Sequence, residues 1–193
     1  MEQVYIEEKT FEKVDFNSKP LIKGEYENCR FFNCDFSNGS LSGYKFIDCE
    51  FSECNLSMAQ LEGTAFRDIV FMDCKMLGLR FDSCNEFGLA FSFENCSLNH
   101  SSFFKTKIQK TSFVNTQLQD TDFTECDLTS SKFDNCDFTR ATFDNTIIEK
   151  ADFRTSINYT IDPEINRIKK AKFSIHGLAG LLSRYDIKID NTL

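Results

Sequence analysis

A large apolar residue recurs at every fifth position over most of this 193-residue chain. A first run extends from Ile6 to Phe81 and a second from Phe93 to Phe153, and together they give 29 repeats without a polar residue at the repeated position. Of the 22 phenylalanines, 17 lie in this series, so phenylalanine is its preferred residue. A period of five fits neither a helix face nor the alternation of a strand. It therefore indicates a repeat architecture.

A second position in each repeat is also selective. We call the large apolar residue the centre; the residue two before it is small, as at Cys29, Cys34, Thr64 and Cys126, and the other three are mostly polar. Two of every five side chains thus face inward, which suits a chain that coils around a common axis. No single coil can bury its own inner face, so stability has to come from stacked neighbours.

The register of the repeat breaks once. Counting on from Phe81 places the next centre at Glu86, whereas counting back from Phe93 places it at Gly88. Two residues are therefore inserted within 84–88, CNEFG. A bulge or short bent linker is the simpler interpretation, because glycine tolerates unusual backbone angles. A functional hinge is the alternative.

Composition bounds the class of protein. The chain has no second compositional region, which suggests one domain with an appendage. No apolar run reaches membrane-spanning length, and the start MEQVYIEEKT has no secretory pattern, so we expect a cytoplasmic protein without a membrane partner. The formal charge of −8 disfavours direct binding of nucleic acid.

The nine cysteines suggest a structural role. All nine fall on the small inward position, so we expect them to pack as small hydrophobes in ladders one coil apart. The chain has only two histidines, His100 and His176, and no arrangement of them with cysteine indicates a metal site. Phosphate-binding glycine loops, zinc motifs and serine elbows are also missing from the sequence. We therefore predict no cofactor, no metal and no catalytic residue.

Several segments resemble a known repeat. CDFSN (34–38), CNLSM (54–58), TDFTE (121–125), CDFTR (136–140) and ADFRT (151–155) are similar to the motif A(D/N)LXX of the pentapeptide-repeat family. The resemblance implies an all-β solenoid, a right-handed quadrilateral β-helix in which four successive repeats close one coil. If coils stack at a strand spacing of ~4.8 Å, 29 sides make about seven coils and a rod of roughly 35 Å.

Sorting the charges by side of this coil predicts a candidate binding surface. The side centred on Ile6, Tyr26, Phe46 and Phe66 carries six acids against Lys45 and Arg67. These six are Glu7, Glu8, Glu25, Glu27, Asp48 and Asp68. A second group of acids lies within 120–152 and is spread over all four sides of the coil. This spread predicts a rod that is charged all round in that region. The acids of this group that we assign to partner binding are Asp120, Asp122, Glu125, Asp127, Asp134, Asp137, Asp144 and Asp152. A merely solubilising surface is the alternative.

The five-residue rule stops after about Ser156, which divides the chain into a repeat region, 1–157, and a C-terminal segment, 158–193. Asp162 followed by Pro163 is a plausible helix start. Ser174 could cap a second helix that runs to about Tyr185. An apolar stripe on that helix could cover the open end of the coil, join two chains in a dimer, or both; it consists of Ile175, Leu178, Leu181, Leu182 and Tyr185.

The C-terminal sequence NYTIDPEINRIKKAKFS (158–174) resembles the C-terminus of the quinolone-resistance (Qnr-type) branch of the same family. The resemblance implies a non-enzymatic homodimer, joined by this segment, whose rod mimics DNA and binds the type II topoisomerases DNA gyrase and topoisomerase IV. It further implies protection of these enzymes from fluoroquinolones. Long loops that project from the coils of some members have no counterpart in this chain. A non-catalytic scaffold with a different partner is the alternative function.

Overall fold

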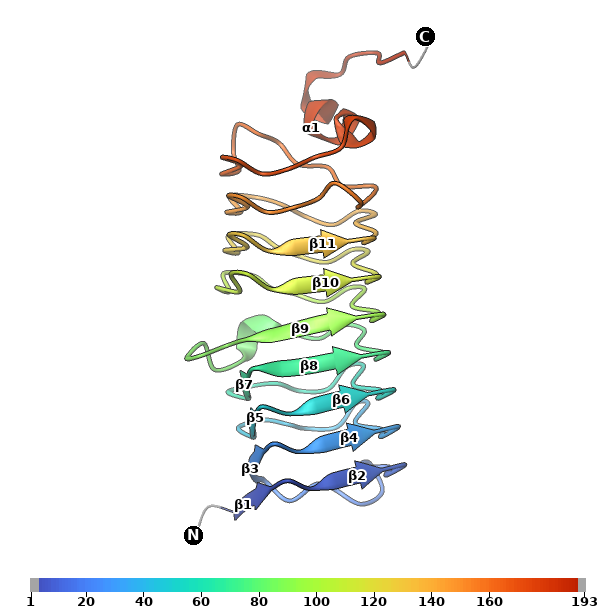
Figure 1. The fold of residues 1–193 in the computed structure, drawn as a ribbon, viewed down its shortest axis with the longest axis vertical. Coiled ribbons are helices and arrows are strands. Elements are labelled where there is room, and N and C mark those ends of the chain that lie inside the picture. The colour runs from blue at the N-terminus through green and yellow to red at the C-terminus, as the bar shows by residue number, and fades with distance from the viewer. Residues whose placement is uncertain (1–3, 191–193) are drawn as a thin grey trace.

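The computed structural model describes residues 4–190, and these form a rod wound from stacked parallel coils (Figure 1). One side of the rod is a four-stranded sheet in the order β1-β3-β5-β7. Its strands are Val4–Glu7, Gly24–Glu27, Lys45–Ile47 and Ala65–Arg67. The adjacent side is a seven-stranded sheet in the order β2-β4-β6-β8-β9-β10-β11. Its strands are Thr10–Glu12, Arg30–Phe32, Glu50–Ser52, Ile69–Met72, Phe91–Glu94, Ser112–Val114 and Lys132–Asp134.

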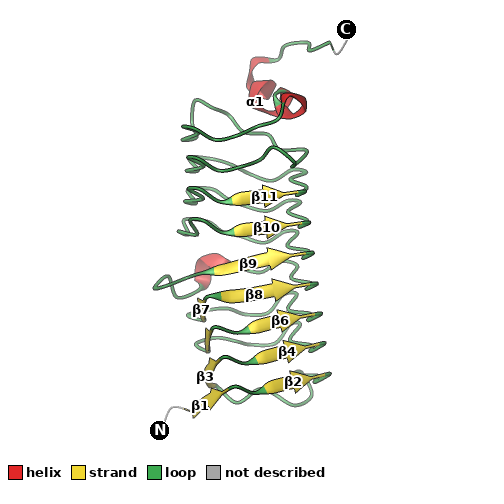
Figure 2. Cartoon of the chain, in the orientation of Figure 1, coloured by secondary structure: helices red, strands yellow, loops and turns green. Residues whose placement is uncertain are grey.

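The strand register confirms the predicted coil of four repeats. Phe11 pairs with Phe31 and Phe31 with Phe51, so each centre lies beside the fourth centre after it and the chain advances by one coil between neighbouring strands. On the other two sides, which carry no strand within residues 4–190 (Figure 2), isolated parallel bridges such as Asp35 with Asn55 keep the same step. The fold is the all-β quadrilateral solenoid that the resemblance to the pentapeptide repeat implied.

The centres form the core of the rod. Phe31 and Phe51 stack with ring centroids 4.6 Å apart, and Phe103 and Phe123 stack at 5.2 Å. From Phe31 through Phe153 each centre of the two runs is buried. Rings on adjacent sides of one coil also meet edge-on, as Phe46 meets Phe51. Both geometries are favourable for aromatic rings.

The side chains at the small inward position also donate hydrogen bonds to the backbone of the preceding coil. The Sγ atom of Cys54 donates to the carbonyl oxygen of Phe31 at 3.3 Å, and that of Cys74 to Phe51 at 3.2 Å. The hydroxyl of Thr146 makes the equivalent bond to Phe123 at 2.8 Å. All nine cysteines are free and all but Cys84 are buried, which confirms their structural role. Burial raises the pKa of Cys49 to about 12, so its thiol stays protonated.

Most corners of the coil are closed by a left-handed residue, two positions after the centre. The φ angle is +51° at Asn28, +50° at Asp48 and +49° at Asn115. Asparagine, aspartate and glycine adopt this conformation with the least strain, and they are frequent at this position. Lys110 and Lys150 also occupy it, with φ of +61° and +59°.

The register break is a local loop. Phe71 pairs with Phe93, whereas a regular coil would have brought Phe91 beside it, and this shift confirms the insertion of two. The backbone amide of Asn85 donates to the carbonyl oxygen of Thr64, which is the sequence separation of a regular coil. The amide of Ala90 donates to Phe66 over a longer sequence separation, so the inserted residues lie between Asn85 and Ala90. The loop follows a single 3-10 turn, Phe81–Ser83, and contains Gly88 with φ of +70°. It projects from the side of the four-stranded sheet, and Phe87 at its tip is 74% exposed.

The C-terminal segment differs in part from its prediction. No helix begins at Asp162; residues 163–165 form a turn, because the chain there continues the coil. Five-residue register also resumes beyond Ser156, since Lys172 bridges Asp152 and Phe173 stacks on Phe153 at 5.5 Å. Ser174 does cap a helical turn, accepting a bond from the Gly177 amide. The expected single helix is broken into Ile175–Gly177, α1 (Ala179–Leu182) and Ser183–Tyr185.

Among residues 4–190, no helix has the length and apolarity that crossing a bilayer requires.

Replacing Phe123 by Ala should lower the free energy of unfolding by about 3–5 kcal/mol, the usual cost of removing a buried phenylalanine. Phe123 is fully buried and stacks on Phe103 and Phe143. Chemical denaturation followed by circular dichroism measures the change. The control is Phe87→Ala, at an exposed ring, which should cost under ~0.5 kcal/mol. A loss below ~1 kcal/mol for Phe123→Ala would show that the centres are not the core.

Candidate functional site

The structure brings the six predicted acids of the first run onto one side of the rod. Glu7 lies in β1, Glu25 and Glu27 lie in β3, and Asp48 and Asp68 follow β5 and β7 at the corners. Glu8 occupies the corner after β1. Because these strands pair in register, the acids follow one another along four successive coils. We call the set Glu7, Glu8, Glu25, Glu27, Asp48 and Asp68 the acidic stripe.

Two contacts moderate the acidic stripe. Lys45 Nζ lies 3.2 Å from Glu25 Oε2, and the hydroxyl of Tyr5 donates to Glu27 Oε2 at 2.7 Å. The bond to the Glu27 carboxylate raises the pKa of Tyr5, since losing that proton would place two negative charges together. The stripe as a whole keeps six acids against Lys45 and Arg67, a local excess of negative charge.

The acids of 120–152 are arranged differently, because many of them hold the coil together. Asp122, Asp127 and Asp137 each accept a bond from the backbone N–H two residues later, at 2.9–3.0 Å. Asp152 accepts a longer bond of the same kind, at 3.3 Å. These four occupy the D/N position of the repeat motif. That position was visible in the sequence and is the signal that could have assigned them a structural role.

The remaining acids of this group also have partners. Asp120 forms two bonds of 2.6 Å with Arg140, and Glu125 lies 3.6 Å from Lys105. Asp134 accepts from the hydroxyl of Thr155 at 2.8 Å, and Asp144 accepts from Asn145 at 2.9 Å. The structure therefore does not gather these eight acids into one surface.

Two of these carboxyl groups are held firmly ionised. Burial opposes the ionisation of Asp137, but bonds from Thr139, Asn158 and Gln119 outweigh it and lower its pKa to about 2. Bonds from Arg154 lower the pKa of Asp152 to about 2. Asp137 thus keeps its full negative charge, whereas the charge of Asp152 is offset in part by Arg154.

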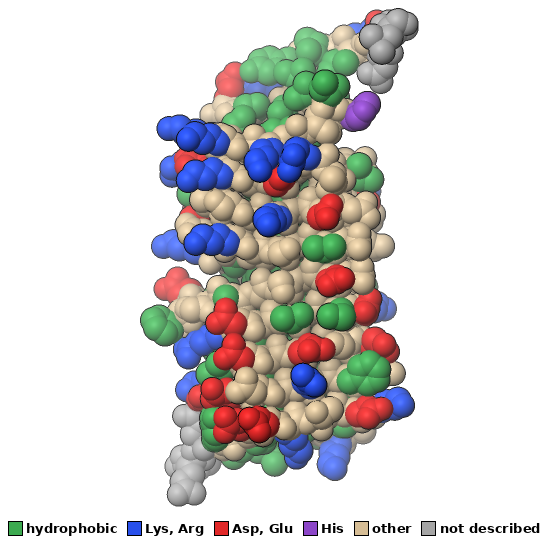
Figure 3. All heavy atoms as spheres, in the orientation of Figure 1, with side chains coloured by type: hydrophobic (Ala, Val, Ile, Leu, Met, Phe, Trp, Pro, Cys, Tyr) green, Lys and Arg blue, Asp and Glu red, His purple; other side chains and the backbone are tan. Residues whose placement is uncertain are grey.

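The net negative charge of the chain is concentrated in its first half. Residues 1–88 hold 16 acidic and nine basic residues, whereas residues 89–193 hold 14 acidic and 13 basic ones. Figure 3 shows the result on one face, where acidic side chains gather toward the N-terminal end and basic ones toward the C-terminal end. The predicted acidic stretch, 120–152, still holds nine acids against three basic residues, and most basic residues of the second half lie outside it.

The predicted apolar stripe of the tail is split between two environments. Leu181 packs against the core and covers the last coil. The other four are exposed, from 36% for Leu182 to 84% for Ile175. Docking of the tail is secured by Arg184, which lies 2.8 Å from Asp162, and by Tyr185, whose hydroxyl donates to Glu164 at 2.7 Å. A β-carbon on Gly177 or Gly180 would overlap Tyr159, so these glycines permit the close approach.

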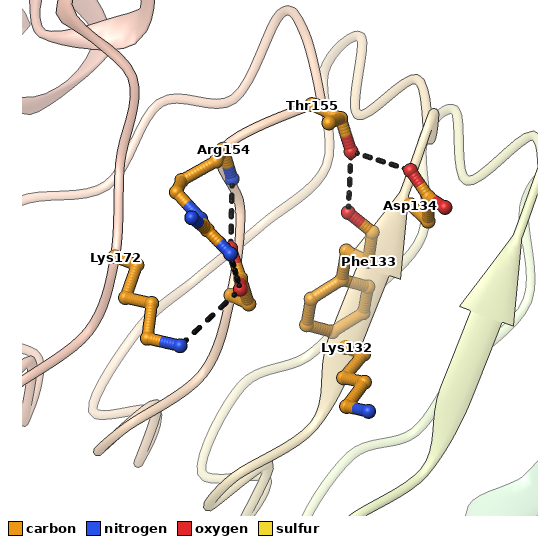
Figure 4. A pocket seen from close by; sticks show the side chains of 7 residues that line it. Lys132, Phe133, Asp134, Arg154, Thr155 and Lys172 are labelled. Atoms are coloured by element: carbon orange, nitrogen blue, oxygen red, sulfur yellow. Dashed lines mark hydrogen bonds and ion pairs between the residues drawn. The ribbon is translucent and has the colours of Figure 1, made fainter.

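The surface has shallow hollows. One of about 600 Å³ lies over the last coils and is lined by Lys132, Phe133, Asp134, Asp152, Arg154, Thr155 and Lys172 (Figure 4). Within the described part of the chain, no three His, Cys, Asp or Glu side chains are placed to hold a metal ion.

Comparison with known families agrees with this architecture. The family described as pentapeptide repeats (8 copies) matches residues 29–68 and 49–85, and the related pentapeptide repeat region matches residues 89–153. The chain belongs to the pentapeptide-repeat proteins. No curated protein gives a significant match to its sequence.

Among solved structures, the fold is similar to that of QnrB1, described as a plasmid-mediated fluoroquinolone resistance protein. The full-length form has a TM-score of 0.63 and 18% identity, over 95% of this chain and all of that one. A trypsin-treated form has a TM-score of 0.62 and 18% identity, over 98% of this chain and all of that one. The likeness therefore extends over the coils and the C-terminal segment alike.

Replacing Gly180 by Ala should loosen the tail, because the added methyl group would meet the carbonyl oxygen of Tyr159. We expect trypsin to cleave after Arg184 about tenfold faster, the effect of lowering the local opening free energy by ~1.4 kcal/mol. Mass spectrometry of timed digests measures the rate. Ser183→Ala, at an exposed neighbour, should leave it unchanged. Equal rates for Gly180→Ala and the unaltered protein would contradict the docking role of this glycine.

Proposed function

We propose that this chain is a non-enzymatic, homodimeric DNA mimic of the cytoplasm that binds a type II topoisomerase, DNA gyrase or topoisomerase IV, and protects it from fluoroquinolones. The observation that carries the proposal is the full-length likeness to QnrB1, which includes the C-terminal segment as well as the coils. Repeat proteins of one fold serve many functions, so the surface has to supply the remaining argument.

The shape of the rod supports the proposal. A stack of coils at ~4.8 Å spacing is a straight cylinder with charges at a regular rise, as duplex DNA is. B-DNA carries one charge per ~1.7 Å of axis, far more than this protein can match with a formal charge of −8. Mimicry would therefore be partial and would depend on local acidity where the rod meets the enzyme.

The acidic stripe is the surface best suited to that contact. It places six acids along four coils on the flat outer face of the β1-β3-β5-β7 sheet, where a basic groove could follow them. Among the eight acids of 120–152, Asp120, Glu125 and Asp152 are paired with Arg140, Lys105 and Arg154, which offset part of their charge. Attraction between exposed charges is screened by salt, so binding should weaken as ionic strength rises.

The tail supplies the proposed dimer contact. Ile175, Leu178, Leu182 and Tyr185 expose apolar surface beyond the needs of the cap, and an isologous contact through them would join two rods end to end. The acidic stripes would then lie toward the two far ends of the dimer, and the less acidic coils would lie near its centre.

A supercoiling assay with gyrase and a fluoroquinolone tests the proposed activity. Adding this protein should restore supercoiling, and Asp48→Lys with Asp68→Lys should raise the amount required by roughly tenfold, or ~1.4 kcal/mol of binding. Both positions are left-handed corners, a conformation that Lys110 already adopts in this chain, so the double variant should fold.

The matched control is Glu53→Lys with Asp73→Lys. These corners lie in the same two coils, have φ of +54° and carry the same charge, but they face outward from the seven-stranded sheet. The control should protect nearly as well as the unaltered protein. Equal losses in both variants would refute the acidic stripe as the contact, and no effect of the unaltered protein on gyrase would favour a scaffold with another partner.

Charged substitutions in the apolar stripe of the tail should dissociate the proposed dimer. Replacing Leu178 and Leu182 by Glu would bury four charges in the dimer contact, so light scattering should report the mass of one chain instead of two. Thermal unfolding should be little changed, because both side chains are exposed in the single chain. A dimer that survives these substitutions would show that another surface joins the chains.

A further inference from the structure

The side of the rod that carries the acidic stripe reverses its charge beyond the loop at Asn85–Ala90. Bridges of Lys107 with Asp127, Asp127 with Ile147 and Ile147 with Arg167 continue this side through four more coils. Residues 106–110, 126–130, 146–150 and 166–170 hold six basic residues against Asp127 and Glu149. The same face therefore has an excess of four negative charges in its first coils and four positive charges in its last.

Most of the basic residues of this region have no ion-pair partner among residues 4–190, and one of its two acids is paired with an arginine. Glu149 lies 2.7 Å from Arg167, and Asp127 accepts bonds from Thr129 and Gln109. Six exposed lysines of these later coils form no ion pair with any residue of 4–190. They are Lys107, Lys110, Lys132, Lys150, Lys169 and Lys170, and we call them the basic edge. Lys132 lies just around the corner, on the adjacent sheet.

The hollow of Figure 4 extends the basic edge onto that adjacent sheet. Lys132 and Lys172 lie on either side of Asp152, whose carboxylate is shared by Arg154 at 2.8 Å and Lys172 at 3.5 Å. Asp152 therefore faces three basic side chains there. Figure 3 shows basic side chains gathered over these C-terminal coils, on the face viewed.

We propose that the basic edge binds the phosphate backbone of duplex DNA. From Lys107 to Lys170 the edge spans three coil steps, about 14 Å at ~4.8 Å per step. That length of B-DNA carries roughly eight phosphates on its two strands. Lys110, Lys150 and Lys170 occupy equivalent left-handed corners in three of these four coils, with Ser130 at the same corner of the other. Lysines held on a rigid wall meet the phosphates without first being ordered, and they would bind independently of base sequence.

The composition of the edge favours duplex DNA over other polyanions. Single strands are held by stacking of bases on aromatic side chains. The segments 106–110, 126–130, 146–150 and 166–170, which form this side of the rod, contain no aromatic residue. Carboxylates of an acidic protein are best recognised by the paired donors of arginine, whereas Arg154 and Arg167 are already bound to Asp152 and Glu149. The expectation of no nucleic-acid contact came from the charge of the whole chain, which hides this segregation.

The inference does not depend on a topoisomerase, and its test uses none. Fluorescence anisotropy of a labelled 20-base-pair duplex (a length chosen at several times the edge) should show binding by the full chain at low salt. The logarithm of the binding constant should fall with that of salt concentration with a slope of about −4 to −5, as four to six displaced counterions require.

The test variant is Lys150→Glu with Lys170→Glu. Both residues are left-handed corners, and Glu8, Glu53 and Glu125 already occupy the same conformation, so the substitutions suit the fold. Binding of the duplex should fall at least roughly tenfold at low salt. The control, Lys19→Glu with Lys23→Glu, makes the same change of net charge at exposed lysines of the opposite end and should lose little.

Three outcomes would overturn the proposal. The first is that the duplex shows no salt-dependent binding, and the second is that the test and control variants lose equal affinity for it. The third is equal affinity of the protein for the duplex and for vesicles of anionic lipid, because this result would show only a general attraction to negative charge. Protection of gyrase without binding of DNA would leave the proposed function standing and remove this inference alone.

Discussion

One repeated contact supports the whole molecule: a buried centre stacks on the centre of the coil before it, and the small residue beside it bonds to that coil's backbone. Phe123 lies between Phe103 and Phe143, while the hydroxyl of Thr146 binds the carbonyl oxygen of Phe123. Apolar burial and the polar bond thus act at the same place. Neither works within one coil, so each coil needs its neighbours.

This contact also explains the surface. Because two side chains of each repeat are committed to the interior, the other three point outward, and their columns run straight along the rod. The acidic stripe and the basic edge lie along one such side, on either side of the loop at Asn85–Ala90. A two-residue insertion at this point leaves the core stack intact, since Phe71 still stacks on Phe93 at 5.4 Å. Charge can therefore change from one end of the rod to the other without any cost to packing.

The period of five was sufficient to predict the buried phenylalanines and the inward cysteines, because it shows which side chains face inward. The closing of four repeats into one coil, and with it the cysteine ladders, was implied by the resemblance to the pentapeptide repeat. The period did not show that the cysteine and threonine side chains donate to carbonyl groups, which depends on the path of the neighbouring coil. The left-handed corners left a signal in the asparagines, aspartates and glycines two residues after the centres. The helix expected at Asp162 failed because Asp162-Pro163 suits a turn as well as a helix, and the coil continues to Phe173. For the binding surface, the acidic stripe could be predicted from register, whereas the partners of Asp120, Asp127 and Asp137 came from neighbouring coils.

The central claim is that the rod takes the place of DNA on a type II topoisomerase. Its most direct test is equilibrium binding of the labelled protein to gyrase, without drug, in the presence of increasing duplex DNA. The salt concentration should be one at which the protein alone does not bind that duplex. The account predicts binding without DNA and displacement of the protein as the duplex fills the enzyme's DNA site. Binding that saturating duplex leaves unchanged, or no binding at all, would contradict it.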